Sequence, residues 1–149
     1  MSLSATIATL AGLGRLKPAP GTIASIAALL LAWPLARFGG PLSLPIGAAL
    51  ATVLGWWASG VYARARGMDD PSDCVIDELA GQWIACAFVH TLPGYGIAFV
   101  LFRLLDITKP WPISAAERLP GGLGIMADDV VAGLAAGLAV LLLARLGAI

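Results

Sequence analysis

Charged residues are scarce in this sequence. Only 12% of its 149 residues are Asp, Glu, Lys or Arg, whereas 59% are hydrophobic and the mean hydropathy is +0.89. Soluble domains carry about 25% charged residues, so this composition argues against an ordinary water-exposed globule and indicates a protein embedded in a lipid bilayer. The nine basic and nine acidic side chains give no net charge. A nucleic-acid partner is therefore not expected, because binding to a phosphate backbone needs an excess of positive charge.

Cysteine and histidine are also scarce, and their scarcity excludes several catalytic mechanisms. Cys74 and Cys86 form no Cys-x-x-Cys pair, and His90 is the only histidine, which argues against a zinc site or a disulfide framework. A Cys-x5-Arg phosphatase loop fails because neither cysteine has an arginine six residues later. The Asp-x-Asp motif of haloacid-dehalogenase phosphatases is not present at Asp106, because threonine stands two residues later. A hydrolase that uses carboxylates and a metal ion is not excluded.

Four stretches contain no charged residue and have lengths that suit the bilayer. They are Pro18–Ala36, Phe38–Ala63, Leu79–Phe102 and Val130–Ala144. A spanning helix needs about 20 apolar residues, and the last stretch is short unless it extends to Ile149. Residues 1–14 have no basic start before their apolar residues, so no cleaved signal peptide is expected. We predict an all-α integral membrane bundle of four to five hydrophobic helices, forming a single domain over residues 1–149.

The last apolar stretch carries small residues at helical spacing. Gly133 and Gly137 lie four residues apart, as do Ala132 and Ala136. Small residues on one face of a membrane helix allow a second helix to approach closely. A helix that is merely rich in alanine would show the same pattern, so both interpretations stay open.

The third apolar stretch contains a turn signal that divides it. The Pro-Gly-Tyr-Gly segment at residues 93–96 predicts two short helices, roughly Leu79–Leu92 and Ile97–Thr108, in a hairpin over about residues 79–108. With the N-terminus inside, the hairpin places seven basic residues in the cytoplasm and two outside, whereas a single span gives five and four. The positive-inside rule therefore favours the hairpin.

The segment Ala11–Ser25 is rich in glycine and proline and carries Arg15 and Lys17. Thr22 is a suitable N-cap for the first spanning helix. Free backbone N–H groups at a helix start suit a phosphate, which Arg15 or Lys17 would neutralise. A capped helix with ordinary positive-inside residues explains the same pattern, and the spacing of a P-loop is missing.

Five acidic residues precede the third apolar stretch. They are Asp69, Asp70, Asp73, Asp77 and Glu78. Asp77 and Glu78 are predicted in the first turn of a helix, where the helix dipole stabilises acids, so simple capping is one explanation. Adjacent carboxylates at a membrane edge also form the hard-oxygen site that Mg²⁺ prefers. The first three acids have the pattern of a solvated turn.

The segment Phe102–Gly133 concentrates charge between two very apolar stretches. It contains Arg103, Asp106, Lys109, Glu117, Arg118, Asp128 and Asp129. Asp106 and Lys109 are three residues apart and share one helical face if the helix continues that far. Asp128 and Asp129 repeat the arrangement of the earlier acidic pair, two acids that open an apolar helix. Metal-assisted phosphoryl transfer requires carboxylates that bind a metal ion and, beside them, basic side chains that bind the phosphate. This segment supplies both.

Three strings of residues and one acidic pair carry a resemblance to a known family. They are Pro-Gly-Thr-x-x-Ser at Pro20–Ser25, Phe-Arg-x-Leu-Asp-x-x-Lys-Pro-Trp-Pro-Ile at Phe102–Ile113, Gly-Gly-x-Gly-Ile-Met-x-Asp-Asp at Gly121–Asp129, and Asp77-Glu78. From about Gly12 to Gly137 the chain resembles the phosphatidylglycerophosphatase A family. It departs from the family at Ala24, where glycine is frequent, and at Ser114, where a basic residue often follows Trp-Pro-Ile.

The resemblance implies a Mg²⁺-dependent integral membrane hydrolase. Such an enzyme would remove the terminal phosphate of phosphatidylglycerophosphate to give phosphatidylglycerol, on the cytoplasmic side of a bacterial inner membrane. Two alternatives remain: a phosphatase of another lipid phosphomonoester, such as phosphatidic acid, or a non-enzymatic transporter or scaffold subunit whose acids bind ions.

The resemblance and the residue chemistry together assign expected roles to twelve side chains. The expected Mg²⁺ ligands are Asp77, Glu78, Asp128 and Asp129, the catalytic residues are Asp106 and Lys109, and the substrate-binding residues are Arg15, Lys17, Thr22, Ser25, Arg103 and Arg118. Asp106 has three possible functions, as a ligand, a general base or the nucleophile of an aspartyl-phosphate, and we rank the first two above the third.

Overall fold

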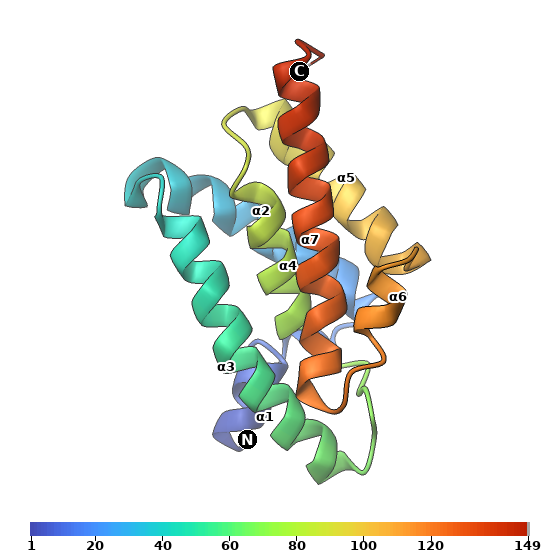
Figure 1. The fold of residues 1–149 in the computed structure, drawn as a ribbon. Coiled ribbons are helices and arrows are strands. Elements are labelled where there is room, and N and C mark those ends of the chain that lie inside the picture. Colours follow the sequence, from blue (N-terminus) through green and yellow to red (C-terminus); the bar gives the residue numbers. More distant parts are fainter. Residues whose placement is uncertain (149) are drawn as a thin grey trace.

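The computed structural model describes residues 1–148, and within them every regular element is a helix. The elements are α1 (Leu3–Ala8), the short 3-10 helix η1 (Leu13–Arg15), α2 (Pro20–Gly39), α3 (Ser43–Arg66), α4 (Ile76–Cys86), α5 (Leu92–Thr108), α6 (Ile113–Ala116) and α7 (Gly122–Arg145). Figure 1 shows one bundle in which α2 crosses obliquely behind α4, with α1 at one end and the end of α7 at the other. The predicted all-α fold is confirmed.

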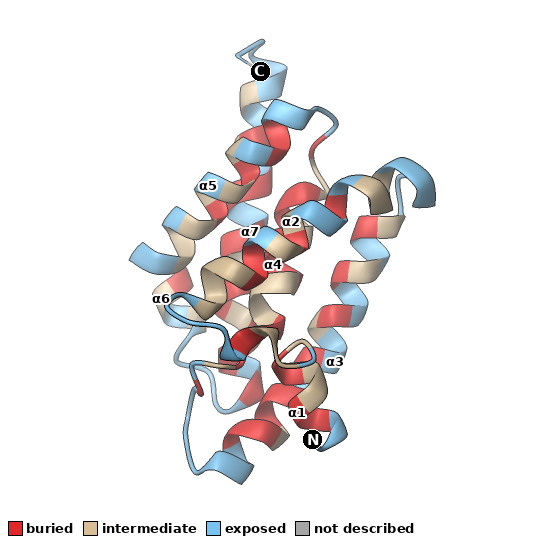
Figure 2. Cartoon of the chain, turned by 180° about the vertical axis from the view of Figure 1, so that it is seen from behind, coloured by how far each residue is buried: buried red, intermediate tan, exposed pale blue. Residues whose placement is uncertain are grey.

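Among the described residues, three helices are long and apolar enough to cross a membrane: α2, α3 and α7. Buried and exposed residues alternate along these helices, as the colouring of Figure 2 shows. Many of the exposed residues are large and apolar. Leu30 of α2, Val53 of α3 and Leu142 of α7 are each about 60% or more exposed, at 69%, 63% and 59%. Apolar surface on this scale is costly in water and favourable against lipid tails. The exposed apolar surface of the bundle therefore suits a lipid bilayer.

The third apolar stretch forms two helices, α4 and α5, that pack on each other, so the hairpin prediction is confirmed. The predicted turn is misplaced, because the chain reverses at residues 87–91 and the Pro-Gly-Tyr-Gly segment lies inside the first turn of α5. Proline is well tolerated at a helix start, where its missing N–H is not needed. Thr91 caps this start, since its hydroxyl accepts from the backbone N–H of Gly94 at 3.2 Å.

Two other helix starts also differ from the predictions. Helix α2 begins at Pro20 with Ala19 as its N-cap, so Thr22 lies inside the helix and does not cap it. Helix α7 begins at Gly122, and its two adjacent acids therefore lie in its second turn instead of opening it. Glycine at the start of α7 is needed for packing, because a Cβ on Gly122 would lie 2.7 Å from the backbone nitrogen of Gly60.

Helix α4 lies at the centre of the bundle, packed against α2, α3, α5 and α7. Its closest neighbour is α7, and glycines make this approach possible. A Cβ on Gly81 would lie 2.6 Å from the carbonyl oxygen of Asp129, and a Cβ on Gly133 would collide with the backbone of Gly81. Ala132 and Ala136 are fully buried beside this contact. The small residues of α7 therefore serve close helix packing, the first of the two interpretations.

Candidate metal centre

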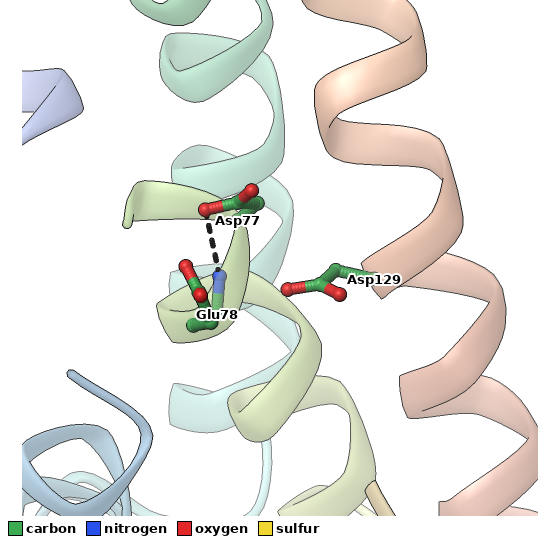
Figure 3. Close-up of side chains that lie close together, drawn as sticks. All are labelled: Asp77, Glu78 and Asp129. Atoms are coloured by element: carbon green, nitrogen blue, oxygen red, sulfur yellow. Dashed lines mark hydrogen bonds between the residues drawn. The ribbon is translucent and has the colours of Figure 1, made fainter. Parts of the chain in front are cut away.

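Five carboxylates from three helices converge near one end of the bundle. Asp77 and Glu78 come from the first turn of α4, as predicted, and Asp106 comes from the last turn of α5. Asp128 and Asp129 come from the second turn of α7. Oxygens of Asp77, Glu78 and Asp129 lie within 4.8 Å of one another, and so do oxygens of Asp106, Asp128 and Asp129. Figure 3 shows the first of these groups, with the Asp129 carboxylate turned toward α4.

The glycine contact between α4 and α7 determines how closely these acids approach. Asp77 and Gly81 are four residues apart, as are Asp129 and Gly133, so each acid shares a helix face with its glycine. Because the two backbones touch at the glycines, the acids one turn away are held opposite each other. Neighbouring backbone N–H groups fix two of the carboxylates: Glu78 N–H donates to Asp77 Oδ1 at 3.1 Å and Asp129 N–H donates to Asp128 Oδ1 at 3.0 Å.

Two oxygens in the cluster are buried and receive no hydrogen bond from the part of the chain that the structure describes. They are Oε2 of Glu78 and Oδ2 of Asp129, and the Asp129 residue is only 2% exposed. An ionised carboxylate that is removed from water and left unpaired costs several kcal/mol. A divalent cation among these oxygens would remove this cost, and oxygen ligands are those that Mg²⁺ and Ca²⁺ take. The donor set therefore fits a hard metal ion.

Arg103 connects the acids to the start of α2. Its guanidinium donates to Asp106 Oδ2 at 2.5 Å, lies 4.0 Å from Glu78 Oε1, and is 3.4 Å from the hydroxyl oxygen of Thr22. A Cβ on Gly21 would collide with the Glu78 carboxylate and lie 3.4 Å from Arg103 Nη2. The predicted Pro-Gly-Thr element therefore packs directly against the acidic cluster, and a side chain at Gly21 would displace the Glu78 carboxylate.

Lys109 supplies the second cation, although not by the geometry expected. Helix α5 ends at Thr108, and Lys109 follows with φ 43°, so it does not continue the helical face of Asp106. Its ammonium donates instead to Asp128 Oδ2 at 2.7 Å and to Glu117 Oε1 at 2.5 Å. Partial burial alone would lower the pKa of Lys109. The two carboxylates have the larger combined effect, so the pKa of Lys109 lies above its usual value. Lys109 therefore carries a full positive charge beside the cluster.

The remaining predicted substrate-binding residues lie apart from this contact network. Ser25 is fully buried and donates to the Gly21 carbonyl at 2.9 Å, so its hydroxyl is occupied within α2. Arg15 is paired at 4.0 Å with Asp73, which also accepts from Tyr62. Lys17 and Arg118 are exposed and form no ion pair within residues 1–148. Their substrate-binding roles stay predictions.

A pocket that the sequence did not predict lies beside the cluster. It measures ≈ 360 Å³, and its lining includes Asp69, Asp70, Glu117 and Asp128. The pocket joins the loop before α4 to the loop before α7, so both loops lie at the same end of the molecule. In the sequence, Asp69 and Asp70 have the pattern of a solvated turn, and Glu117 has no basic residue three or four positions away. No local signal marks these contacts, since each depends on packing between distant segments.

A helical membrane bundle with a carboxylate cluster near one end, flanked by an arginine and a lysine, defines an integral membrane protein with a candidate site for a metal ion and an anion. Comparison with protein families identifies the class: the model of the phosphatidylglycerophosphatase A family matches residues 6–144. The chain belongs to this family, and membership supports a phosphatase activity.

Three curated relatives illustrate the similarity. The phosphatidylglycerophosphatase A of Escherichia coli K12 is 38% identical over 117 residues, which cover 76% of this chain and 67% of that protein. The protein of the same name from Haemophilus influenzae is 39% identical over 124 residues, covering 81% and 76%. A Bacteroides thetaiotaomicron protein with the provisional name phosphatidylinositol-3-phosphatase is 35% identical over 124 residues, covering 77% of each chain. No solved structure matches this chain.

Proposed function

We propose that this chain is a Mg²⁺-dependent phosphatase that hydrolyses the terminal phosphomonoester of phosphatidylglycerophosphate to give phosphatidylglycerol. Family membership and two relatives that carry this activity in their names support the substrate. The observation that carries the chemistry is the convergence of five carboxylates with Arg103 and Lys109. We further propose that the whole chain acts as one membrane-embedded phosphatase domain, with its site at the cytoplasmic face of a bacterial inner membrane.

In this proposal the acids of α4 and α7 hold the metal. Asp77, Glu78, Asp128 and Asp129 are the ligands, and their buried, unpaired oxygens are the groups that gain most from a cation. Mg²⁺ bound there would polarise the phosphoryl oxygens and favour ionisation of the attacking water. Asp106 lies within the same cluster, where it either completes the ligand set or accepts the proton of the water.

The cations of the site would bind and orient the phosphate. Arg103 presents its guanidinium beside Thr22 and Gly21, in the first turn of α2, where backbone N–H groups have no helical acceptor. Lys109 is held at Asp128 and remains charged. Positive groups fixed where negative charge develops stabilise a phosphoryl-transfer transition state. The lipid tails would stay in the bilayer beside the apolar faces of the helices.

Phosphate release from a panel of lipids tests the proposed substrate. The purified protein is assayed with phosphatidylglycerophosphate, phosphatidic acid and phosphatidylinositol 3-phosphate, with Mg²⁺ and with a chelator. We expect fastest release from phosphatidylglycerophosphate, loss of activity in chelator, and recovery when Mg²⁺ is restored. The phosphoinositide is included because one relative carries a name for that activity. Preference for either other lipid would reassign the substrate, and release unaffected by chelator would contradict the metal.

The positions of two loops give a prediction about membrane topology. Ser72 lies in the loop before α4 and Ser114 lies in α6. Both segments belong to the end of the bundle that carries the acids, so we expect cysteines at Ser72→Cys and Ser114→Cys to react with an impermeant reagent from the cytoplasmic side of sealed vesicles. The native cysteines should react little with the reagent, because Cys74 and Cys86 are buried and burial raises the pKa of Cys74 to about 12. Labelling of the two sites from opposite sides would rule out this arrangement.

A further inference from the structure

The five acids divide into two overlapping groups that share one residue. Asp77, Glu78 and Asp129 form the first group, and Asp106, Asp128 and Asp129 form the second. In each group the ligand oxygens lie within 4.8 Å of one another, which is close enough for one cation to contact all three. Asp129 is the only member common to both groups.

We propose that the centre holds two divalent cations, one in each group, with the Asp129 carboxylate bridging them. The proposal rests on the proposed metal-dependent function, and it assigns Asp106 to metal ligation instead of proton transfer. Pairs of divalent ions with a shared carboxylate are a recurrent solution for phosphate-ester hydrolysis, because one ion can stabilise the attacking oxygen and the other the leaving oxygen.

The state of the Asp129 side chain supports a ligand independently of the acid count. Asp129 is 2% exposed, and its Oδ2 has no hydrogen-bond donor within residues 1–148. Its carboxylate points from α7 toward the acids of α4, as Figure 3 shows. Glu78 Oε2, in the first group, is also buried and unpaired. A buried carboxylate that faces other carboxylates without a donor must be neutralised by a proton or by a cation, and a metal cation has the advantage that it compensates several acids at once.

The charge of the cluster favours two cations over one. Within residues 1–148, three of the five acids contact two cationic side chains, Arg103 and Lys109, which leaves three negative charges uncompensated when all five acids are ionised. A single divalent cation would leave the cluster negative, and a phosphomonoester with its own negative charge would be repelled. Two divalent cations make the cluster positive. Glu117 would reduce this charge only slightly, because its side chain is half exposed and screened by solvent.

The two positions differ in how their acids are already compensated. In the second group, Arg103 contacts Asp106 at 2.5 Å and Lys109 contacts Asp128 at 2.7 Å. In the first group, the only basic side chain in range among residues 1–148 is Arg103, 4.0 Å from Glu78. A cation in the first group therefore meets less competing positive charge. We expect this position to fill first and the second position to bind at least tenfold more weakly.

Manganese binding followed by electron paramagnetic resonance tests the pair without an activity measurement. The full-length protein in detergent, stripped of metal, is titrated with Mn²⁺. The first equivalent should give the spectrum of an isolated ion. The second equivalent should replace it with the broadened spectrum of two ions coupled through a shared ligand, and the binding isotherm should saturate at two ions per chain.

Three variants separate the two positions. Asp106→Asn should bind one Mn²⁺ with an uncoupled spectrum, because only the second group is damaged. Glu78→Gln should weaken the first binding step, and Asp129→Asn should abolish coupling at any Mn²⁺ concentration. The exposed Asp69, exchanged as Asp69→Asn, is the matched control and should behave as wild type. Equal elution of all variants as monodisperse particles shows that they are folded.

The outcomes distinguish this inference from the proposed function. Saturation at one uncoupled Mn²⁺ in a protein that hydrolyses phosphatidylglycerophosphate would overturn the pair and leave the function intact. Two coupled ions in a protein that releases no phosphate from this lipid would support the pair and contradict the proposed substrate. Coupling that survives in Asp129→Asn would overturn the bridging role of Asp129.

Discussion

Phosphate release is expected to fall by about 10²-fold or more when any one of the five clustered acids loses its charge. The changes are Asp77→Asn, Glu78→Gln, Asp106→Asn, Asp128→Asn and Asp129→Asn, each of which keeps the size of the side chain. Changes to groups that merely support metal ligands already cost roughly 10–100-fold, so loss of a ligand itself should cost at least as much. The measurement is the turnover of purified variants on phosphatidylglycerophosphate at saturating Mg²⁺.

The control for this series is Asp69→Asn, an exposed acid outside both ligand groups, which should retain turnover close to wild type. Asp129→Asn should be the most damaged variant, because this residue belongs to both groups. If folded variants of all five acids kept near-native turnover, the carboxylates would be helix caps and structural charges, and the metal-assisted mechanism would be wrong.

A single methyl group added at Gly133 is expected to disable the site from one helical turn away. A Cβ there would collide with the backbone of Gly81, so Gly133→Ala must push α7 away from α4. The acids on the same faces, Asp77 and Asp129, would then separate. A displacement of about 1 Å at a catalytic site can cost 10²-fold in rate, and overpacking costs roughly 1–3 kcal/mol of stability. We expect a loss of about 10²-fold in turnover together with a lower midpoint of thermal unfolding.

Gly96→Ala is the matched control for this change. Gly96 also lies inside a helix, but a Cβ added to it meets no atom within 4 Å. Alanine is about 1 kcal/mol more favourable than glycine in a helix, so both variants gain the same intrinsic preference and differ only in the contact. Gly96→Ala should keep full turnover and unfold at the same or a higher temperature. Normal activity and stability in Gly133→Ala would show that the glycine contact does not position the acids.

Features that depend on nearby residues could be predicted from the sequence. Uncharged runs of membrane length predicted the helical bundle, and Asp77 and Glu78 lie in the first turn of α4 because they directly precede an apolar run. Glycine was harder to interpret. The glycines of the Pro-Gly-Tyr-Gly segment indicated a turn, but they lie at the start of α5, where a Cβ on Gly94 would lie 2.7 Å from the side chain of Val89.

The contacts of the site itself could not be predicted. Lys109 was expected beside Asp106, three residues away, but the helix ends before it and its ammonium contacts Asp128, nineteen residues along the chain. Arg103 lies beside Thr22, at a separation of 81 residues. Pairings of this kind follow from how α2, α5 and α7 pack around α4, which no local pattern encodes. The sequence predicted a set of charged residues for one site, and the packing determines which of them meet.

The most direct test of the central claim is the Mg²⁺ dependence of phosphate release in a matched pair of proteins. Wild-type protein and Asp129→Asn are titrated with Mg²⁺ on phosphatidylglycerophosphate in mixed micelles, starting from chelated, metal-free protein. The carboxylate cluster predicts that wild-type turnover rises from near zero to saturation while Asp129→Asn stays at least about 10²-fold lower at every concentration. Equal turnover of the two proteins, or full wild-type turnover in chelator, would contradict it.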